Sequence, residues 1–181
     1  MEAVVEREDE TLDIVSAGFM PLLDAALLVV AHEKGFCRDQ GIHLDLHRET
    51  SWATIRDRMA IRHFDVAHML APMPIAAALE NGPMDTAVIA PMALGLGGNA
   101  VTVSTELWAE MRADGAVANG DAAANGAALA RAIAKRAAAG KPPPVFGMVH
   151  RYSSHNLELR YWLSASGIIP GRDARFVVVP P

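Results

Sequence analysis

The sequence has 181 residues, a formal net charge of −5 and a sequence pI of about 5.8. Hydrophobic residues make up 51% of the chain, charged residues 20%, and the mean hydropathy is +0.18, which is typical of a globular protein with one or two small cores. No cluster of Lys and Arg appears, which argues against a broad surface for nucleic-acid phosphates. The single cysteine, Cys37, cannot form an internal disulfide and leaves the redox compartment open.

The N-terminus gives no sign of export. Residues 1–10 are acidic and lack both the basic and the apolar region of a secretory signal. We therefore expect a cytoplasmic protein for the sequence as written, and a periplasmic one if the native gene encodes an export signal ahead of Met1. No apolar run approaches the roughly 20 residues that cross a bilayer, so membrane insertion is not expected.

The first hundred residues alternate between strand and helix patterns. Residues 42–48 alternate apolar and polar side chains, which predicts a strand with one solvated face. Residues 22–34 form a helical run that follows Pro21 and is closed by Gly35. The predicted elements are strands at 12–18, 42–48, 65–70, 86–90 and 100–104, and helices at 22–34, 53–63 and 75–80. Strands and helices that alternate through short loops predict βαβ units, a mostly parallel sheet and the α/β fold class.

The second half of the chain has a more uneven composition. Residues 112–126 are rich in Ala, Gly, Asn and Asp and predict a loop, whereas residues 127–139 predict an Ala-rich helix. Strands are expected at 145–149 and 176–179. We therefore expect three parts: a first α/β lobe at 11–108, a flexible low-complexity segment with the Ala-rich helix at 109–144, and the incomplete beginning of a second α/β lobe at 145–181.

A short helix with a polar N-terminus is predicted within residues 153–170. Ser or Asn side chains in its first residues can cap it, and Gly167 and Pro170 end it. The start of a helix offers free N–H groups and the positive end of the helix dipole, to which His155 and the serines add side-chain donors. This helix start suits a small anion, and we take His155 as a ligand contact.

Other candidates follow predicted strands, where ligands of parallel sheets bind. Trp52 is either a core side chain or the wall of a pocket, where it would exclude water and strengthen hydrogen bonds to an anion. His68 has the same two interpretations, with core packing favoured. The loop at residues 95–99 is either a plain turn or a turn whose N–H groups face a small ligand, and a nucleotide loop is the least supported alternative because no Gly-Lys-Ser/Thr follows.

No catalytic or metal chemistry is predicted. His43 and His47 lie on one face of a predicted strand, but no cysteine or third ligand converges on them. No Ser-His-Asp, Cys-His or paired-carboxylate group can be assembled from the pattern. We therefore expect no catalytic residue, no metal and no cofactor.

Six segments of the sequence carry a resemblance to a known family. They are Leu12–Leu22, Glu33–Ile42, Ser51-Trp52-Ala53-Thr54-Ile55-Arg56-Asp57, Asp65–Pro74, Gly98–Ser104 and His155-Asn156-Leu157-Glu158-Leu159-Arg160-Tyr161-Trp162-Leu163. Together they resemble the nitrate- and bicarbonate-binding family of ABC-transporter solute receptors. The resemblance covers nearly all of residues 12–181.

This resemblance implies a two-lobed type II periplasmic-binding-protein fold that closes on nitrate, nitrite or bicarbonate. The family's ligand tryptophan then falls on Trp52, its histidine on His155, and its backbone and polar contacts on Gly97, Gly98 and Asn99. Family members are longer than this chain, so the resemblance also implies that a basic residue supplied by their later half is absent here.

The resemblance leaves three functional interpretations. The protein is a receptor that delivers its anion to an ABC permease, or it belongs to a similar branch of cytoplasmic nitrate and nitrite sensors. Such a sensor holds an RNA-binding antiterminator protein and releases it when the anion binds, without contacting nucleic acid itself. The third interpretation is an enzyme of a related fold, of the pyrimidine or menaquinone biosynthesis type. Binding of a small anion without catalysis is the leading expectation.

Overall fold

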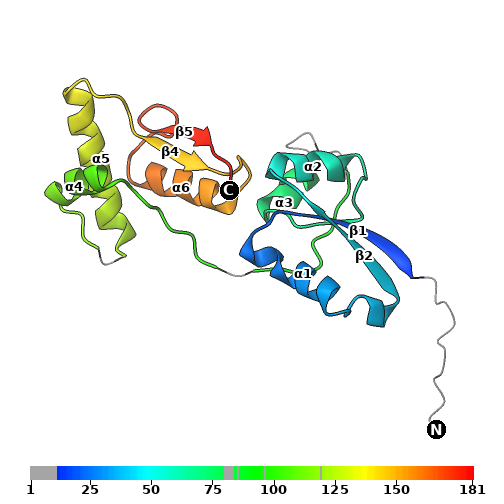
Figure 1. Ribbon diagram of the computed structural model, residues 1–181. Helices are drawn as coiled ribbons and strands as arrows, with labels where there is room; N and C mark the ends of the chain where they lie inside the picture. Colours follow the sequence, from blue (N-terminus) through cyan, green and yellow to red (C-terminus); the bar gives the residue numbers. More distant parts are fainter. Residues whose placement is uncertain (1–11, 80–83, 85, 96, 119) are drawn as a thin grey trace, which may run out of the picture. The chain divides into compact units, whose positions relative to one another are not determined.

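The computed structural model describes residues 12–79, 84, 86–95, 97–118 and 120–181, so the acidic residues 1–10 and the predicted helix end at Glu80 lie outside the described residues. The chain divides into two compact units, residues 1–96 and residues 97–181. Each unit is described by itself below, with the labels of Figure 1.

The first unit is built on a parallel sheet. Its strands are β1 (Asp13–Phe19), β2 (Ile42–Arg48) and β3 (Val66–Ala67), in the order β2-β1-β3 (Figure 1). Asp13 lies opposite Ile42, and Ala17 lies opposite Val66. The predicted parallel sheet is confirmed, and the three strands end at the same edge because they run in one direction.

Helices connect these strands. They are η1 (Leu23–Ala25), α1 (Ala26–Glu33), η2 (Arg38–Gln40), α2 (Trp52–Ala60) and α3 (Pro72–Ala78). Ser51 caps α2, because its hydroxyl oxygen accepts a hydrogen bond of 3.0 Å from the Thr54 N–H. Gly41 has a left-handed φ of 74°, which turns the chain from η2 into β2. The sequence therefore places the start of α2, and with it Trp52, directly beyond the end of β2.

Helix α1 has an apolar surface that the rest of the structure leaves uncovered. Six of its eight residues are apolar, and none of the eight is buried. Leu27 is 51% exposed and Val30 is 46% exposed. This exposed surface contrasts with the centre of the sheet, where Ala17 is fully buried.

The described part of the second unit contains helices and a short parallel sheet. Its elements are α4 (Thr105–Ala113), α5 (Ala122–Ala138), β4 (Val145–Met148), α6 (Ser154–Ala165) and β5 (Arg175–Val178). β4 and β5 pair in parallel, with Phe146 opposite Phe176. Buried apolar side chains from four of these elements form one core, which includes Met111, Leu129, Ile133, Phe146, Leu159 and Leu163.

Helices α5 and α6 are also joined by a side-chain contact. The Trp162 indole Nε1–H donates a hydrogen bond of 2.8 Å to the Ala122 carbonyl oxygen. Gly126 lies where a Cβ atom would be 3.0 Å from the Ser166 Cβ and 3.1 Å from Trp162 Nε1. The absence of a side chain at Gly126 therefore permits the two helices to approach closely.

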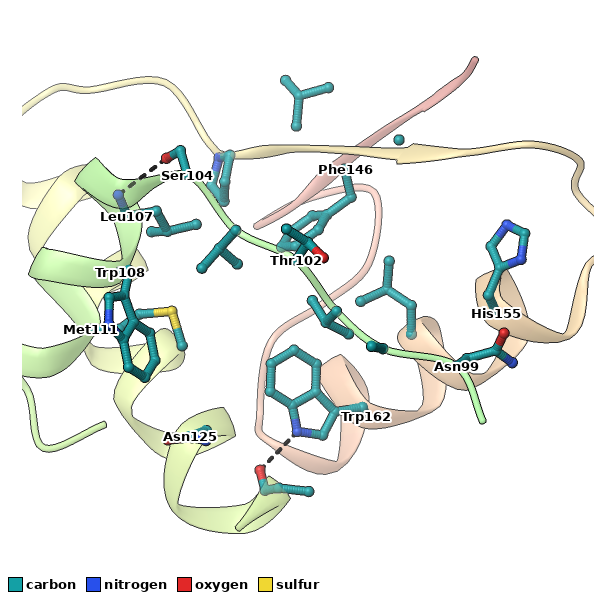
Figure 2. A pocket seen from close by; sticks show the side chains of 18 of the residues that line it. Asn99, Thr102, Ser104, Leu107, Trp108, Met111, Asn125, Phe146, His155 and Trp162 are labelled. Atoms are coloured by element: carbon teal, nitrogen blue, oxygen red, sulfur yellow. Dashed lines mark hydrogen bonds between the residues drawn. The ribbon is translucent and has the colours of Figure 1, made fainter. Parts of the chain in front are cut away.

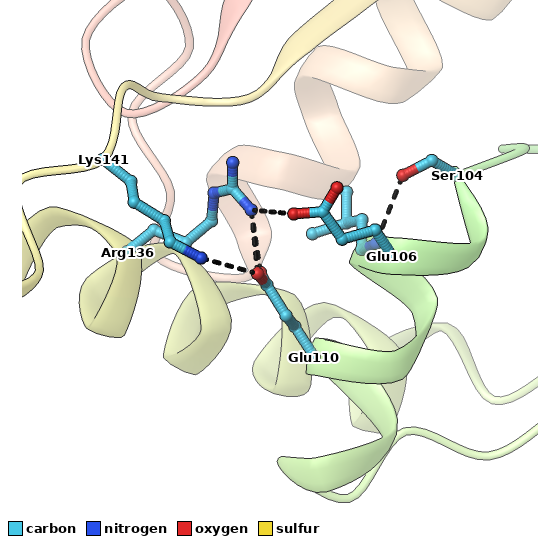
Figure 3. A network of polar contacts seen from close by, with 6 residues as sticks. Ser104, Glu106, Glu110, Arg136 and Lys141 are labelled. Atoms are coloured by element: carbon cyan, nitrogen blue, oxygen red, sulfur yellow. Dashed lines mark hydrogen bonds and ion pairs between the residues drawn. The ribbon is translucent and has the colours of Figure 1, made fainter.

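An ion-pair network attaches α4 to α5 (Figure 3). Arg136 Nη1 lies 2.9 Å from Glu110 Oε1, and the same oxygen lies 3.5 Å from Lys141 Nζ. The hydrogen bond from Arg136 is the main reason that the pKa of Glu110 is lowered, and the charges of Arg136 and Lys141 lower it further. Ser104 caps α4 by accepting from the Leu107 N–H at 3.2 Å.

Several predicted elements differ from the structure. Residues 86–90 and 100–104 are not strands, and the strand predicted at 65–70 is reduced to β3. The loop predicted at 112–126 is wrong at both ends, because α4 continues to Ala113 and α5 begins at Ala122 after its Asp121 cap.

The compact units also differ from the expected segments. Residues 97–108, expected in the first lobe at 11–108, belong to the second unit, and so do the expected segments 109–144 and 145–181. The physical reason is packing: Val103, Leu107 and Trp108 lie against the core of the second unit. Nowhere in the described ranges is a helix both long and apolar enough to cross a bilayer.

Candidate functional site

Trp52 is buried in the first unit, just beyond the carboxyl end of β2. It is the first residue of α2 and is 2% exposed. Its ring meets the ring of His68 edge to face, with centroids 4.9 Å apart and an interplanar angle of 84°. The indole Nε1 is buried, and no described residue accepts its hydrogen.

His68 follows β3 directly and is 3% exposed. Its Nε2 lies 3.1 Å from Asp24 Oδ2, whereas its buried Nδ1 has no hydrogen-bond partner among the described residues. Asp24 follows β1, Trp52 follows β2 and His68 follows β3, so the three side chains come from the carboxyl ends of three parallel strands. This is the edge at which ligands of open α/β sheets bind.

The two unpartnered nitrogens are informative because buried polar atoms are rarely left unsatisfied. Each such atom costs about 1–3 kcal/mol when it is removed from water without a partner. An indole N–H is only a donor, so a ligand that satisfies Trp52 must offer an acceptor. An oxyanion oxygen is such an acceptor.

The start of α6 forms a second polar site, in the second unit. The buried Ser153 hydroxyl caps the helix by accepting from the Asn156 N–H at 3.3 Å, and it donates to the His150 carbonyl oxygen at 2.8 Å. The predicted cap is confirmed. Gly167 has the left-handed φ of 79° that follows the helix end, as predicted.

His155 lies at this helix start with one ring nitrogen engaged. Its Nε2 accepts a hydrogen bond of 3.3 Å from the Val149 N–H and lies 3.0 Å from the Ser153 Oγ. Burial lowers the pKa of His155, and the nearby Glu158 carboxylate raises it to a smaller extent. The ring is therefore neutral near pH 7, and because Nε2 is the acceptor, the proton lies on Nδ1 as a donor.

Asn99 is the predicted site residue that the structure places with His155. Both line a groove of about 1070 Å³, and Figure 2 shows them at the same end of it. The Asn99 Nδ2 donates to Glu158 Oε2 at 2.9 Å and lies 3.4 Å from the Ser154 Oγ. The remaining walls are largely apolar and include Trp108, Met111, Phe146 and Trp162.

Gly97 and Gly98 do not line this groove. A Cβ atom at either position would meet no atom within 4 Å, and neither glycine has a positive φ. They therefore lack the alternating left-handed backbone of an anion-binding nest. Trp52 belongs to the first unit and the other four predicted residues to the second, so the predicted roles of all five stay predictions.

Sequence reasoning did not select Asp24, and it left His68 as either a core side chain or the wall of a pocket. Asp24 lies within a predicted helix and His68 within a predicted strand, so no local pattern indicated their contact. That contact of 3.1 Å joins residues 44 positions apart. No group of three or more metal-ligating side chains occurs within the described part of the chain.

Comparisons with known proteins agree with the fold. A family model described as the NMT1-like family matches residues 8–181. The chain is 36% identical over 170 residues to the nitrate import ATP-binding protein NrtC of Synechocystis sp., and 32% identical over 169 residues to the nitrate/nitrite binding protein NrtA of Nostoc sp.. These matches cover 91% of this chain but 23% and 35% of the two relatives.

A solved structure extends the agreement to three dimensions. The crystal structure of the periplasmic nitrate-binding protein NrtA from Synechocystis PCC 6803 superposes with a TM-score of 0.73 at 29% identity, over 94% of this chain and 42% of that one. The chain thus spans less than half the length of these relatives. The predicted α/β fold of periplasmic-binding-protein type, present in part, is confirmed, and so is the predicted kinship with nitrate- and bicarbonate-binding proteins. This chain belongs to the NMT1-like family.

Proposed function

We propose that this chain contributes to a non-catalytic binding site for a small oxyanion, nitrate or nitrite, with bicarbonate as the alternative ligand. The observation that carries the proposal is the buried, unpartnered indole N–H of Trp52 at the carboxyl edge of a parallel sheet. The relatives, which are nitrate, nitrite and bicarbonate transport or binding proteins, support this choice of anion.

In this proposal each unit offers hydrogen-bond donors of its own. Trp52 donates its indole N–H, and His155 donates its Nδ1–H from a neutral ring. Asn99 offers an amide N–H, and Gly97 and Gly98 offer backbone N–H groups next to it. All of these are neutral donors, which suits a singly charged anion that must also be released.

Two versions of this function differ in partner and location. The names of the relatives favour a component of an ABC transporter that meets a permease, in the periplasm if an export signal exists. The other version is a cytoplasmic sensor that holds an antiterminator protein and releases it when the anion binds. No specific observation favours an enzyme of a related fold.

The test is isothermal titration of the purified chain with nitrate, nitrite and bicarbonate, with chloride as the control anion. Trp52→Phe removes the indole N–H and keeps an aromatic ring, so we expect it to weaken oxyanion binding at least tenfold. Phe36→Leu, at an exposed aromatic position of the same unit, is the control and should bind as the parent does. An unchanged affinity in Trp52→Phe would remove Trp52 from the site.

The two versions can be separated by co-purification. A sensor must release its partner when nitrate binds, because a ligand shifts a complex only if it binds the two states differently. Capture of a partner without nitrate and its release with nitrate supports the sensor. A complex that stays intact when nitrate is added contradicts the sensor version.

A further inference from the structure

The two ring nitrogens of His68 have different surroundings. Nε2 lies 3.1 Å from a carboxylate oxygen of Asp24, whose side chain is 43% exposed, whereas Nδ1 is buried without a partner among the described residues. The backbone N–H of His68 donates to the Gly18 carbonyl oxygen at 2.8 Å, which fixes the residue against β1. The residue is therefore held by its backbone N–H and by its ring Nε2, and only Nδ1 remains to contact a ligand.

The contact with Asp24 decides what Nδ1 can do. A carboxylate accepts hydrogen bonds, so Nε2 carries a proton. In the neutral ring Nδ1 is then a bare acceptor, and in the protonated ring it is a donor. The same nitrogen thus demands opposite partners in the two states.

Trp52 fixes which hydrogen-bonding group a ligand must offer beside His68. Its Nε1 is always a donor, it is buried without a partner, and its ring touches that of His68. Nitrate has no proton and offers only acceptor oxygens. Bicarbonate has acceptor oxygens and one hydroxyl group, which can donate.

We propose that His68 is a specificity-determining residue that distinguishes oxyanions by whether they carry a proton. A proton-free anion such as nitrate binds beside Trp52 only when His68 takes up one proton from solvent and donates through Nδ1. Bicarbonate binds to the neutral ring, and its own hydroxyl donates to Nδ1. This inference rests on the proposed function, because it takes Trp52 as a ligand donor.

The charges around His68 are consistent with such a switch. Asp24, in η1, is the charged group that the described contacts place against the ring. From α2 the ring meets the uncharged Trp52. The charged side chains of α2 are paired elsewhere, because Arg58 lies 2.7 Å from Glu49 and Arg56 lies 2.6 Å from Asp57.

The test measures protons as well as heat. The intact 181-residue chain is titrated with sodium nitrate and with sodium bicarbonate, in buffers of different ionisation enthalpy, between about pH 6 and pH 9. We expect uptake of close to one proton per nitrate where the ring of the free protein is neutral, and a nitrate affinity that falls up to tenfold per pH unit there. Bicarbonate should show little uptake.

Three variants sharpen the result. His68→Gln has a permanent amide donor, so it should bind nitrate without proton uptake. Asp24→Asn removes the carboxylate that accepts from Nε2, and it should weaken nitrate binding more than bicarbonate binding. His63→Gln changes an exposed histidine of the same unit and should behave as the parent does.

The outcomes separate the two proposals. Nitrate binding without proton uptake, or with the same uptake in His68→Gln, overturns the role of His68 and leaves oxyanion binding intact. Uptake that survives in His68→Gln but is lost in His155→Gln assigns the proton to the second unit and overturns it too. A folded chain that binds neither anion contradicts the proposed function and, with it, this inference.

Discussion

The ideal Cβ position on Gly126 lies 3.1 Å from the indole nitrogen of Trp162, so helices α5 and α6 touch where α5 has no side chain. The same indole nitrogen donates to the carbonyl oxygen of Ala122, one turn earlier in α5. The contact between these helices therefore depends on a small residue and a hydrogen bond that lie side by side.

Gly126→Ala should destabilise the second unit. Alanine favours a helix over glycine by about 1 kcal/mol, but overpacking of a close contact costs about 1–3 kcal/mol, and we expect the loss to be larger. Urea unfolding measures the difference. Adding Ser166→Gly removes the Ser166 Oγ and Cβ, which are two of the three atoms nearest to the added Cβ, and should restore part of the stability, whereas a stable Gly126→Ala single variant would contradict the contact.

Ser51→Ala should act on both stability and binding. The Ser51 hydroxyl caps α2, and loss of such a cap costs about 1 kcal/mol. Because Trp52 is the first residue of that helix, fraying of its first turn should also weaken anion binding in titration. Ser51→Thr keeps the capping oxygen and is the control, so equal losses in both variants would argue against capping as the cause.

His155 should make the second unit less stable in mild acid. Burial lowers its pKa below the ordinary value of 6.5, so the unfolded chain binds more protons than the folded chain just below that value. Its stabilising contribution is complete above pH 6.5 and is lost as the pH falls toward the lowered pKa. In His155→Gln this part of the loss should disappear, which unfolding midpoints at a series of pH values can show.

Glu110 should affect the stability of the second unit at a lower pH than His155 does. The hydrogen bond from Arg136 lowers the pKa of Glu110 below its ordinary value of 4.5, so its contribution is present above pH 4.5 and is lost as the pH falls through the lowered pKa. We expect Glu110→Gln to be less stable than the parent at neutral pH and equally stable in strong acid. Asp173→Asn, which removes a different exposed ion pair, checks that the effect belongs to the α4–α5 network.

Some elements were predicted correctly from local sequence patterns alone. The alternation in residues 42–48 predicted β2 over the range that the structure shows, and the polar residues at 153–156 predicted the capped start of α6. Residues 100–104 show the limit of such patterns. They contain β-branched side chains, which favour strands. A strand also needs a hydrogen-bonded neighbouring strand, and these residues do not pair with one in the described part of the chain. Val103 packs instead against the core of the second unit.

The candidate site was only partly predictable, because its contacts join residues far apart in sequence. Trp52 could be selected from its position after a strand and from a family resemblance. The pairing of His68 with Asp24 depends on how the ends of β1 and β3 align, which neither segment encodes alone. Asn99 and His155 line one groove for a similar reason.

The uncovered surface of α1 affects how this chain should be handled in solution. Apolar dyes bind to exposed hydrophobic side chains, and Leu27 and Val30 offer such a surface in the folded state. A dye-based melting experiment should therefore begin from a high signal, and the signal alone would be mistaken for unfolding. Circular dichroism reports helix content directly and is the appropriate readout for every melt of this chain.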